Sequence, residues 1–115
     1  MNDGSLPLFR GRSLRLDSPP LVMGIVNVTP DSFYPGSRHR GAAEAAEAAL
    51  AMEAQGAAIV DLGGESTRPG SESLGEEEEL ERVVPVIAAI RSRSELPISV
   101  DTRKASVARA ALQAG

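Results

Sequence analysis

The stretch AAIVDLGGESTRPG, at residues 57–70, decides how this chain folds. Its apolar half leads into Asp61, and residues with turn chemistry follow directly. A short apolar run that ends in turn residues is typical of a strand with both faces buried in a parallel sheet. We therefore predict a strand that ends near Asp61 and a polar loop at residues 63–74.

Two other stretches have the same form. MGIVNVTPDSF at residues 23–33 leads into Asn27, and LPISVDTRK at residues 96–104 leads into Asp101. The predicted strands cover residues 21–28, 57–62 and 97–100. In parallel α/β proteins, ligands bind at the carboxyl ends of the strands. The polar residues that end these strands are therefore the first candidates for a binding site.

The segments between the strands predict helices. Residues 42–55 are rich in alanine, which has the highest helix propensity, and Gly56 follows as an expected C-cap. A second helix is expected to start near Gly75. Its first turn, residues 76–79, consists of four glutamates, which favour the positive end of the helix dipole. This interpretation of the acidic run is preferred to a metal site.

Apolar spacing predicts which face of each helix is buried. On the second helix the apolar positions are Leu80, Val83, Val84, Ile87 and Ile90. Pro85 lies within this pattern and predicts a kink rather than a break. A third helix is expected from Arg103, with Thr102 as its cap. Its inward-facing residues are expected to be Val107, Ala108, Ala111 and Leu112.

A strand followed by a helix occurs three times, which predicts parallel pairing with right-handed crossovers. A short β-hairpin is expected first, with Gly11 at its turn. The predicted domains are therefore the hairpin at residues 1–20 and three βα units at residues 21–115. Three units fit half of a doubly wound sheet, or the start of a (β/α)₈ barrel, which needs about 250 residues.

Composition argues against several classes of function. The chain has 115 residues, a net charge of −4 and no cysteine, which excludes disulfides and thiolate metal sites and is compatible with the cytoplasm. Scattered basic residues without interleaved aromatics argue against nucleic-acid binding. No run approaches the roughly 20 apolar residues of a membrane helix, and the N-terminus has no apolar signal core. The sequence has no Ser-His-Asp set, Walker loop or GxGxxG motif.

Each strand-ending residue has a structural and a functional interpretation. Asp101 either flanks a helix N-terminus or accepts two parallel N–H bonds from the planar, guanidine-like edge of a heterocycle. Asn27 either satisfies loop backbone groups or offers its amide oxygen to a hard cation such as Mg²⁺. Asp61 opens a loop in which Gly63 and Gly64 allow close approach of backbone or ligand.

The loops carry further candidates. Thr67 offers a hydroxyl, and Arg68 offers a guanidinium suited to phosphate or carboxylate, although an exposed loop arginine is more often only solvated. Phe33 and Tyr34 either wall an aryl pocket or pack their own loop down. His39, the only histidine, has no partner nearby in sequence and is assigned no catalysis.

Taken together, the three stretches resemble the dihydropteroate synthase family of folate biosynthesis in their order and spacing. RVVPVIAAI resembles the family's second helix, proline included, and the N-terminal hairpin is similar as well. The resemblance covers about residues 21–115. It implies a partial (β/α)₈ TIM barrel and a cytoplasmic transferase that joins 6-hydroxymethyl-7,8-dihydropterin pyrophosphate to p-aminobenzoate, giving 7,8-dihydropteroate and pyrophosphate.

The resemblance also implies roles for the candidate residues. Asn27 would bind Mg²⁺ and the pyrophosphate end of the substrate, and Asp101 would hold the pterin edge. Thr67 and Arg68 would belong to a second mobile loop that contacts pyrophosphate.

The same loop would help form the arylamine site with Pro69. Phe33 would lie on the first mobile loop and pack against p-aminobenzoate, and Asp61 would support the same mouth. The family's homodimer would involve late helices that this chain does not contain.

Two departures from the family pattern are evident. The family's first loop usually continues DSFSDGG, whereas residues 31–37 read DSFYPGS and lack the second aspartate. Strands four to eight of a barrel are missing, so we expect an incomplete N-terminal portion that is inactive alone. The alternatives are a pterin-binding relative without synthase activity, and a non-enzymatic fragment that assembles with itself or with a separate C-terminal half.

Overall fold

The computed structural model describes residues 4–16, 20–28, 38–63 and 75–115, and for residues 38–40 the backbone alone. Three parallel strands form one sheet in the order β3-β4-β5. These strands are β3 (Met23–Asn27), β4 (Ile59–Gly63) and β5 (Ile98–Asp101). The helices are α1 (Arg38–Ala54), α2 (Glu76–Arg91) and α3 (Ala105–Ala114). A separate two-stranded sheet consists of β1 (Ser5–Pro7) and β2 (Ser13–Arg15).

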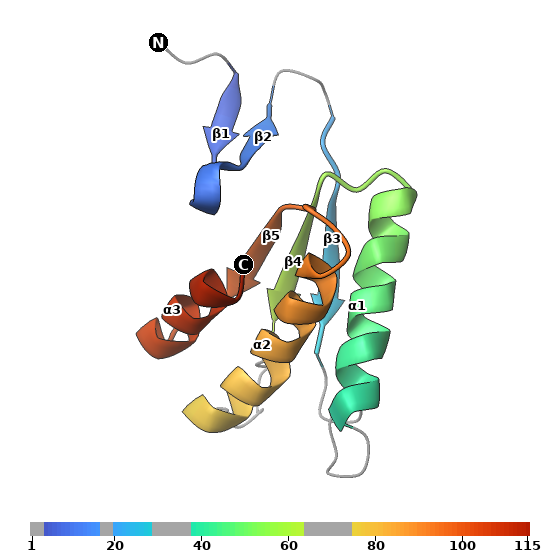
Figure 1. Cartoon of the computed structure of the whole chain (residues 1–115). Coiled ribbons are helices and arrows are strands. Elements are labelled where there is room, and N and C mark those ends of the chain that lie inside the picture. Colours follow the sequence, from blue (N-terminus) through green and yellow to red (C-terminus); the bar gives the residue numbers. More distant parts are fainter. Residues whose placement is uncertain (1–3, 17–19, 29–37, 64–74) are drawn as a thin grey trace, which may run out of the picture.

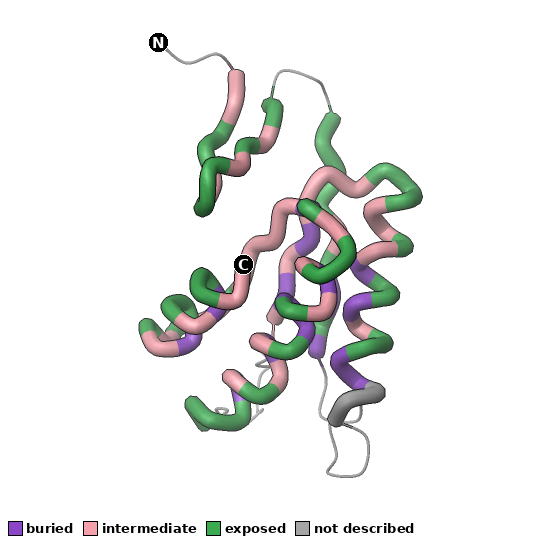
Figure 2. Tube along the Cα trace, viewed as in Figure 1, coloured by how far each residue is buried: buried purple, intermediate pink, exposed green. Residues whose placement is uncertain are grey.

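The three helices lie on one face of the sheet (Figure 1). Val60 and Leu62 of β4 point toward them and are fully buried. The core consists of apolar residues from the sheet and from the inner sides of the helices, which Figure 2 shows as buried. Its largest fully buried members include Leu62 of β4 and Ile87 and Ile90 of α2. The predicted order of strands and helices is therefore confirmed.

α1 approaches β3 closely because Gly24 has no side chain. A Cβ atom at this position would lie 2.5 Å from the Sδ atom of Met52 in α1. Ala42, Ala46 and Ala49 form the buried side of the same helix. Small residues on both elements therefore set the distance between α1 and the sheet.

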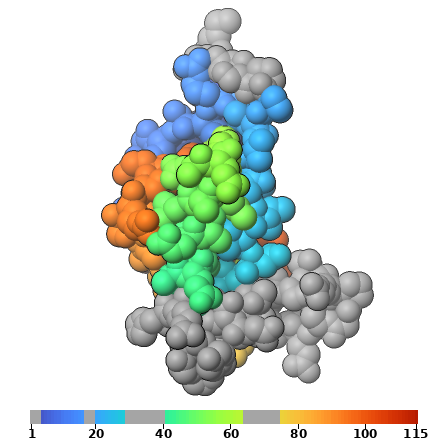
Figure 3. Space-filling model, turned by 90° about the vertical axis from the view of Figure 1, so that its right-hand side faces the viewer, coloured from blue at the N-terminus to red at the C-terminus, as the bar shows by residue number. Residues whose placement is uncertain are grey.

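β3 is an edge strand of the sheet. It runs openly along the molecular surface beside α1, as the light blue atoms beside the green ones show (Figure 3). Its residues Met23 and Ile25 are 50% and 61% exposed, and Leu21 and Val22 just before it are exposed as well. An apolar edge of this kind is a template for pairing with another chain.

α2 follows the predicted pattern in part. The helix runs through Pro85 without a break, and Val83, Ile87 and Ile90 are buried as expected, together with Val86. Leu80 and Val84, which were predicted on the same buried face, are only partly buried. One finding concerns Glu79, which was interpreted with its three neighbours as an acidic first turn that favours the helix dipole. It is 1% exposed, whereas Glu76, Glu77 and Glu78 are exposed.

The predictions for α3 are partly wrong. The helix begins at Ala105 with Lys104 as its N-cap, and Thr102 lies two residues earlier. The Oγ1 atom of Thr102 accepts a hydrogen bond from the N–H of Lys104, at 3.2 Å, so it closes a turn instead of capping the helix. Val107 and Ala111 are buried as predicted, but Ala108 and Leu112 are exposed because they border an open hollow.

The hairpin confirms the expected turn and docks against the end of α3. Leu6 pairs with Leu14, and a short 3₁₀ helix at Phe9–Gly11 joins the strands with Gly11 at a φ of 75°. Arg10 donates from its Nη2 atom to the carbonyl oxygen of Gln113, at 2.9 Å. A cation near the last carbonyls of a helix interacts favourably with the helix dipole.

Candidate functional site

The ends of the three strands form level rungs across the sheet. In the last rung Asn27 pairs with Gly63, and Gly63 pairs with Asp101. Two rungs below, Asp61 lies between Ile25 and Ser99. Since successive side chains of a strand point to opposite faces, these residues share the face away from the helices. We call this the bare face, and it carries Met23, Ile25, Asn27, Ile59, Asp61, Ser99 and Asp101.

One hydrogen bond confirms this orientation. The Oγ atom of Ser99 donates to the Oδ1 atom of Asp61 at 2.5 Å, so both side chains lie on the same face. Sequence reasoning had not singled out Ser99. The alternation of side chains along β5 places Ser99 on the same face as Asp101. The register between β4 and β5 then places it beside Asp61.

Asn27 and Asp101 lie open at the last rung. Both are exposed, and their side chains form no hydrogen bond with another described residue. The structural alternative for Asn27 was that its amide satisfies backbone groups of the loop that follows, and residues 29–37 of that loop lie outside the described parts of the chain. The structural alternative for Asp101 was pairing with the helix start, yet the N–H of Lys104 bonds to Thr102 instead.

Gly63 keeps the space between these two residues open. A Cβ atom on Gly63 would lie 4.0 Å from the Oδ1 atom of Asn27, so the amide oxygen points along the bare face toward the centre of the rung. The N–H of Val28 donates to the carbonyl oxygen of Gly63 at 2.9 Å, which extends the ladder beyond Asn27. The rung is therefore a rigid support with an amide on one side and a carboxylate on the other.

Four predicted site residues lie outside the described parts of the chain. They are Phe33, Thr67, Arg68 and Pro69. The structure therefore brings together Asn27, Asp61 and Asp101. That Thr67 lies close to them stays a prediction.

An ion pair with a buried glutamate, which sequence reasoning missed, joins α2 to the start of α3. The Nζ atom of Lys104 donates to the Oε1 atom of Glu79 at 2.7 Å. A signal for it was present in the spacing. Glu79 occupies the same helical stripe as the buried residues Val83, Val86 and Ile90, at steps of four, three and four.

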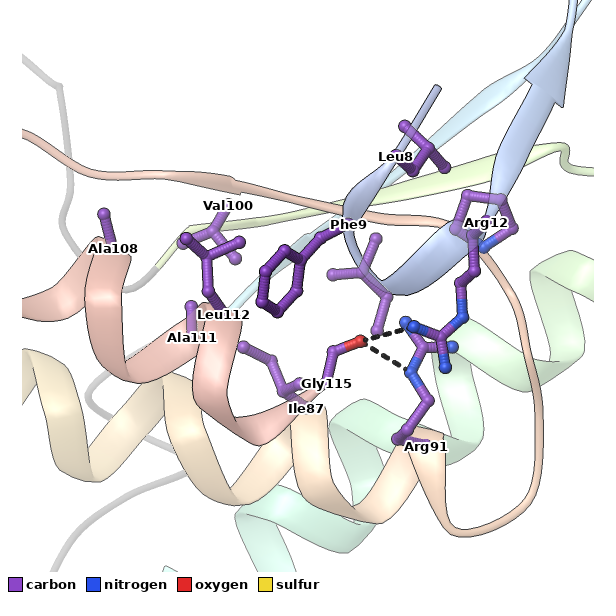
Figure 4. A pocket seen from close by; sticks show the side chains of 12 residues that line it. Leu8, Phe9, Arg12, Ile87, Arg91, Val100, Ala108, Ala111, Leu112 and Gly115 are labelled. Atoms are coloured by element: carbon purple, nitrogen blue, oxygen red, sulfur yellow. Dashed lines mark hydrogen bonds between the residues drawn. The ribbon is translucent and has the colours of Figure 1, made fainter. Parts of the chain in front are cut away.

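A hollow of about 230 Å³ lies on the other side of the sheet, between the hairpin and the helices. Figure 4 shows the ring of Phe9 inside it, with Arg12 and Arg91 at one end. Both arginines donate to the carbonyl oxygen of Gly115, Arg91 at 2.9 Å and Arg12 at 3.3 Å. Burial, then the charge of Arg12, lowers the pKa of Arg91, and Glu95 acts in the opposite direction.

The hollow is not the candidate site. Its lining from β5 comes from Ile98 and Val100, which point to the helix side of the sheet, away from Asp101. Apart from two arginines that bond to carbonyl groups, its lining offers no acid, base or nucleophile. The chemistry lies instead on the bare face.

Within the described ranges, no group of three or more histidine, cysteine, aspartate or glutamate residues is arranged to hold a metal ion. Among the described helices, none combines the length and the apolar character that crossing a membrane requires.

Similar proteins place this geometry in a family. The family model described as pterin binding enzyme matches residues 23–115. Dihydropteroate synthase from Escherichia coli strain K12 is 52% identical over 106 residues, which are 92% of this chain and 37% of that protein. The Bacillus subtilis dihydropteroate synthase is 55% identical over 95 residues, which are 83% of this chain and 33% of that protein. The chain thus spans about a third of the length of these relatives.

Solved structures agree with the sequence relatives. The Xanthomonas albilineans dihydropteroate synthase with 4-aminobenzoic acid matches at a TM-score of 0.81 and 52% identity, over 92% of this chain and 39% of that one. The fold is therefore part of a pterin-binding TIM barrel, as predicted, and the doubly wound alternative is excluded. Because the family model covers most of its length, this chain belongs to the family of pterin binding enzymes.

Proposed function

We propose that residues 21–115 supply the first three βα units of a dihydropteroate synthase, with residues 1–20 as its N-terminal hairpin. The enzyme would join 6-hydroxymethyl-7,8-dihydropterin pyrophosphate to p-aminobenzoate, giving 7,8-dihydropteroate and pyrophosphate. The observation that carries this proposal is the last rung, where Asn27 and Asp101 flank Gly63 on the bare face. Relatives about 50% identical bear that enzyme's name, and one solved structure holds 7,8-dihydropteroate.

Asp101 is suited to hold the pterin. The pyrimidine edge of a pterin presents parallel N–H donors, and an unpaired carboxylate can accept two of them in one plane. Asp101 is such a carboxylate, exposed at a strand end and free of other described partners. Asp61, two rungs deeper and bonded to Ser99, would support the floor of the same site.

Asn27 is suited to the pyrophosphate end and to Mg²⁺. Its amide oxygen is a hard donor of the kind that Mg²⁺ accepts, and Mg²⁺ commonly takes few protein ligands and shares the substrate's phosphates. The residues present therefore fit the ion in donor type, with Asn27 as its ligand. When bound, Mg²⁺ would neutralise charge on the departing pyrophosphate.

The reaction needs no protein nucleophile. The bond between the pterin methylene carbon and the pyrophosphate oxygen breaks, and its electron pair leaves with the pyrophosphate. The amine nitrogen of p-aminobenzoate then forms the new bond to the methylene carbon and gives up a proton. Asp101 and Asn27 would hold the two ends of the pterin substrate so that this carbon faces the amine.

The remaining roles belong to residues outside the described parts. Thr67 and Arg68 would contact the pyrophosphate, and Pro69 and Phe33 would border the p-aminobenzoate. A homodimer and a cytoplasmic location are part of the same proposal for a full-length enzyme.

A chimera tests the proposal. Residues 21–115 replace the matching segment of the Escherichia coli relative, and dihydropteroate formation is measured from the two substrates. We expect an active chimera whose activity is lost in the Asp101→Asn variant. A folded chimera that makes no product contradicts the synthase proposal.

A second candidate function is favoured by one observation. Residues 31–37 lack the second aspartate usual in the family's first loop. A chimera that binds 6-hydroxymethylpterin yet forms no dihydropteroate would identify the chain as part of a pterin-binding relative without synthase activity.

A further inference from the structure

Glu79 is the one charged residue that is buried among those the structure describes. Its Oε1 atom accepts a hydrogen bond from Lys104, whose side chain is 26% exposed. Its Oε2 atom is also buried and has no hydrogen-bond partner in the described ranges. A partly satisfied buried carboxylate contributes less stability than an apolar side chain of similar size. Its presence in the core therefore indicates a role other than stability.

The ion pair joins the first turn of α2 to the residues that follow β5. Glu79 is the fourth residue of α2, and Lys104 follows Asp101 by three residues. Lys104, in the turn between Asp101 and α3, takes part in two hydrogen bonds that bear on its position. Thr102 accepts the N–H of Lys104 at 3.2 Å, and Glu79 binds the side chain of Lys104 at 2.7 Å.

The second of these bonds connects the turn to α2. The bond to Thr102 is local, within two residues, and cannot fix where the turn lies. The bond to Glu79 spans 25 residues and anchors the turn to α2, whose other buried residues pack in the core. Losing it removes this link between the start of α3 and α2.

We propose that Glu79 and Lys104 form a positioning pair, which holds the turn after β5 so that Asp101 keeps its orientation on the bare face. The claim that the turn controls pterin binding through Asp101 rests on the proposed function. The claim that the ion pair holds the turn in place is independent of that function, so the two claims can be tested separately.

The first experiment uses this chain and measures amide hydrogen exchange by NMR. The double variant Glu79→Leu/Lys104→Met removes both charges together, which preserves folding better than removing one. We expect the amides of Lys104 and Ala108 to exchange about 10-fold faster, since local openings are governed by local contacts. The amides of Val28 and Val60, which bond within the sheet, should not change.

A matched control is available in an exposed pair. Glu47 and Arg93 form an ion pair with side chains that are 63% and 55% exposed. The double variant Glu47→Leu/Arg93→Met should leave exchange at Lys104 and Ala108 unchanged. Unchanged exchange at these amides in the Glu79/Lys104 variant, or an equal increase throughout the sheet, would overturn the positioning role.

The second experiment measures binding of 6-hydroxymethylpterin to the chimera. In the Glu79→Leu/Lys104→Met background we expect affinity to fall about 10-fold or more, because a binding group displaced by a fraction of an ångström loses its geometry. The KM for p-aminobenzoate should stay within about 2-fold, since no part of the pair faces that substrate in the proposed site. Undiminished pterin affinity in a folded variant would overturn the link to Asp101. If the unmodified chimera binds no pterin, the proposed function fails, and the exchange experiment alone then decides the positioning of the turn.

Discussion

Asn27 and Asp101 end the two outer strands of the sheet at the same level, with only Gly63 between them. Their side chains lie on the face that the helices leave bare, and both are exposed. Since the two residues are 74 positions apart in the sequence, it is the parallel register that brings them together. This arrangement places a hard amide oxygen and a carboxylate at the two sides of one shallow support.

Replacing either of these residues should weaken substrate binding without unfolding the protein. In the chimera, Asp101→Asn should reduce affinity for 6-hydroxymethylpterin about 10-fold to 100-fold, the usual range for a charge-assisted hydrogen bond. Calorimetric titration measures the loss. Glu95→Gln is the control, because Glu95 pairs with Arg12 at the opposite end of the sheet. Equal effects of the two variants would contradict a specific role of Asp101.

Burial predicts a large difference between two isoleucines. Ile90→Ala should lower the free energy of unfolding of this chain by about 2–5 kcal/mol, because the fully buried side chain leaves a cavity. Ile25→Ala should change it by less than about 0.5 kcal/mol, because Ile25 is 61% exposed on the bare face. Urea unfolding at low protein concentration provides both values. Similar losses would mean that the bare face is covered in solution.

The contact between β3 and α1 predicts a coupled pair of substitutions. Gly24→Ala places a methyl group 2.5 Å from the Sδ atom of Met52 and should cost about 1–3 kcal/mol through overpacking. Met52→Ala in the same background should restore part of that loss, since the added methyl then has space. A double-mutant cycle measures the coupling. Strictly additive effects would show that α1 moves away from the sheet instead.

The open edge of β3 predicts self-association. Leu21, Val22, Met23 and Ile25 are exposed along this strand, and unpaired strand edges with apolar neighbours pair readily. We expect the 115-residue chain to elute earlier from a sizing column as its concentration rises. Ile25→Lys should restore a monomer.

Elution as a monomer at every concentration, with cooperative unfolding, would contradict this prediction. It would also count against the alternative in which the chain functions as a non-enzymatic fragment that requires assembly.

Much of the fold could be predicted from the sequence because its local signals agree with one another. Each apolar run that ends in a polar residue became a strand, and the alanine-rich segment became α1. Boundaries moved by a few residues, as at α1, which begins at Arg38 before the alanines. Gly56 follows α1 with a φ of 112°, as expected for a glycine at a helix end.

The misses have a common physical cause. Glu79 was interpreted only as one of four first-turn glutamates that favour the helix dipole, although its position on the stripe of Val83 and Val86 places it in the core. Leu112 was assigned to the core from its spacing, yet it is 48% exposed because it borders the hollow beside Phe9. In both cases the outcome depends on a partner distant in sequence, Lys104 for one and the hairpin for the other. Periodicity within one helix contains no information about such partners.

Some residues of the candidate site could likewise be predicted from the sequence, and others could not. The strand ends identified Asn27, Asp61 and Asp101, and the register confirmed that they share one face. Ser99 was missed because a serine inside a strand carries no motif, and only the pairing of β4 with β5 places it against Asp61. The roles of Phe33, Thr67, Arg68 and Pro69 remain predictions from the sequence.

The most direct test is a crystal structure of the chimera with 6-hydroxymethylpterin bound. The proposal predicts the carboxylate of Asp101 within hydrogen-bonding distance of the ring N–H groups, with the pterin lying against the bare face beside Asn27. A pterin bound in the hollow between Phe9 and α3, or one bound without contact to Asp101, would contradict it.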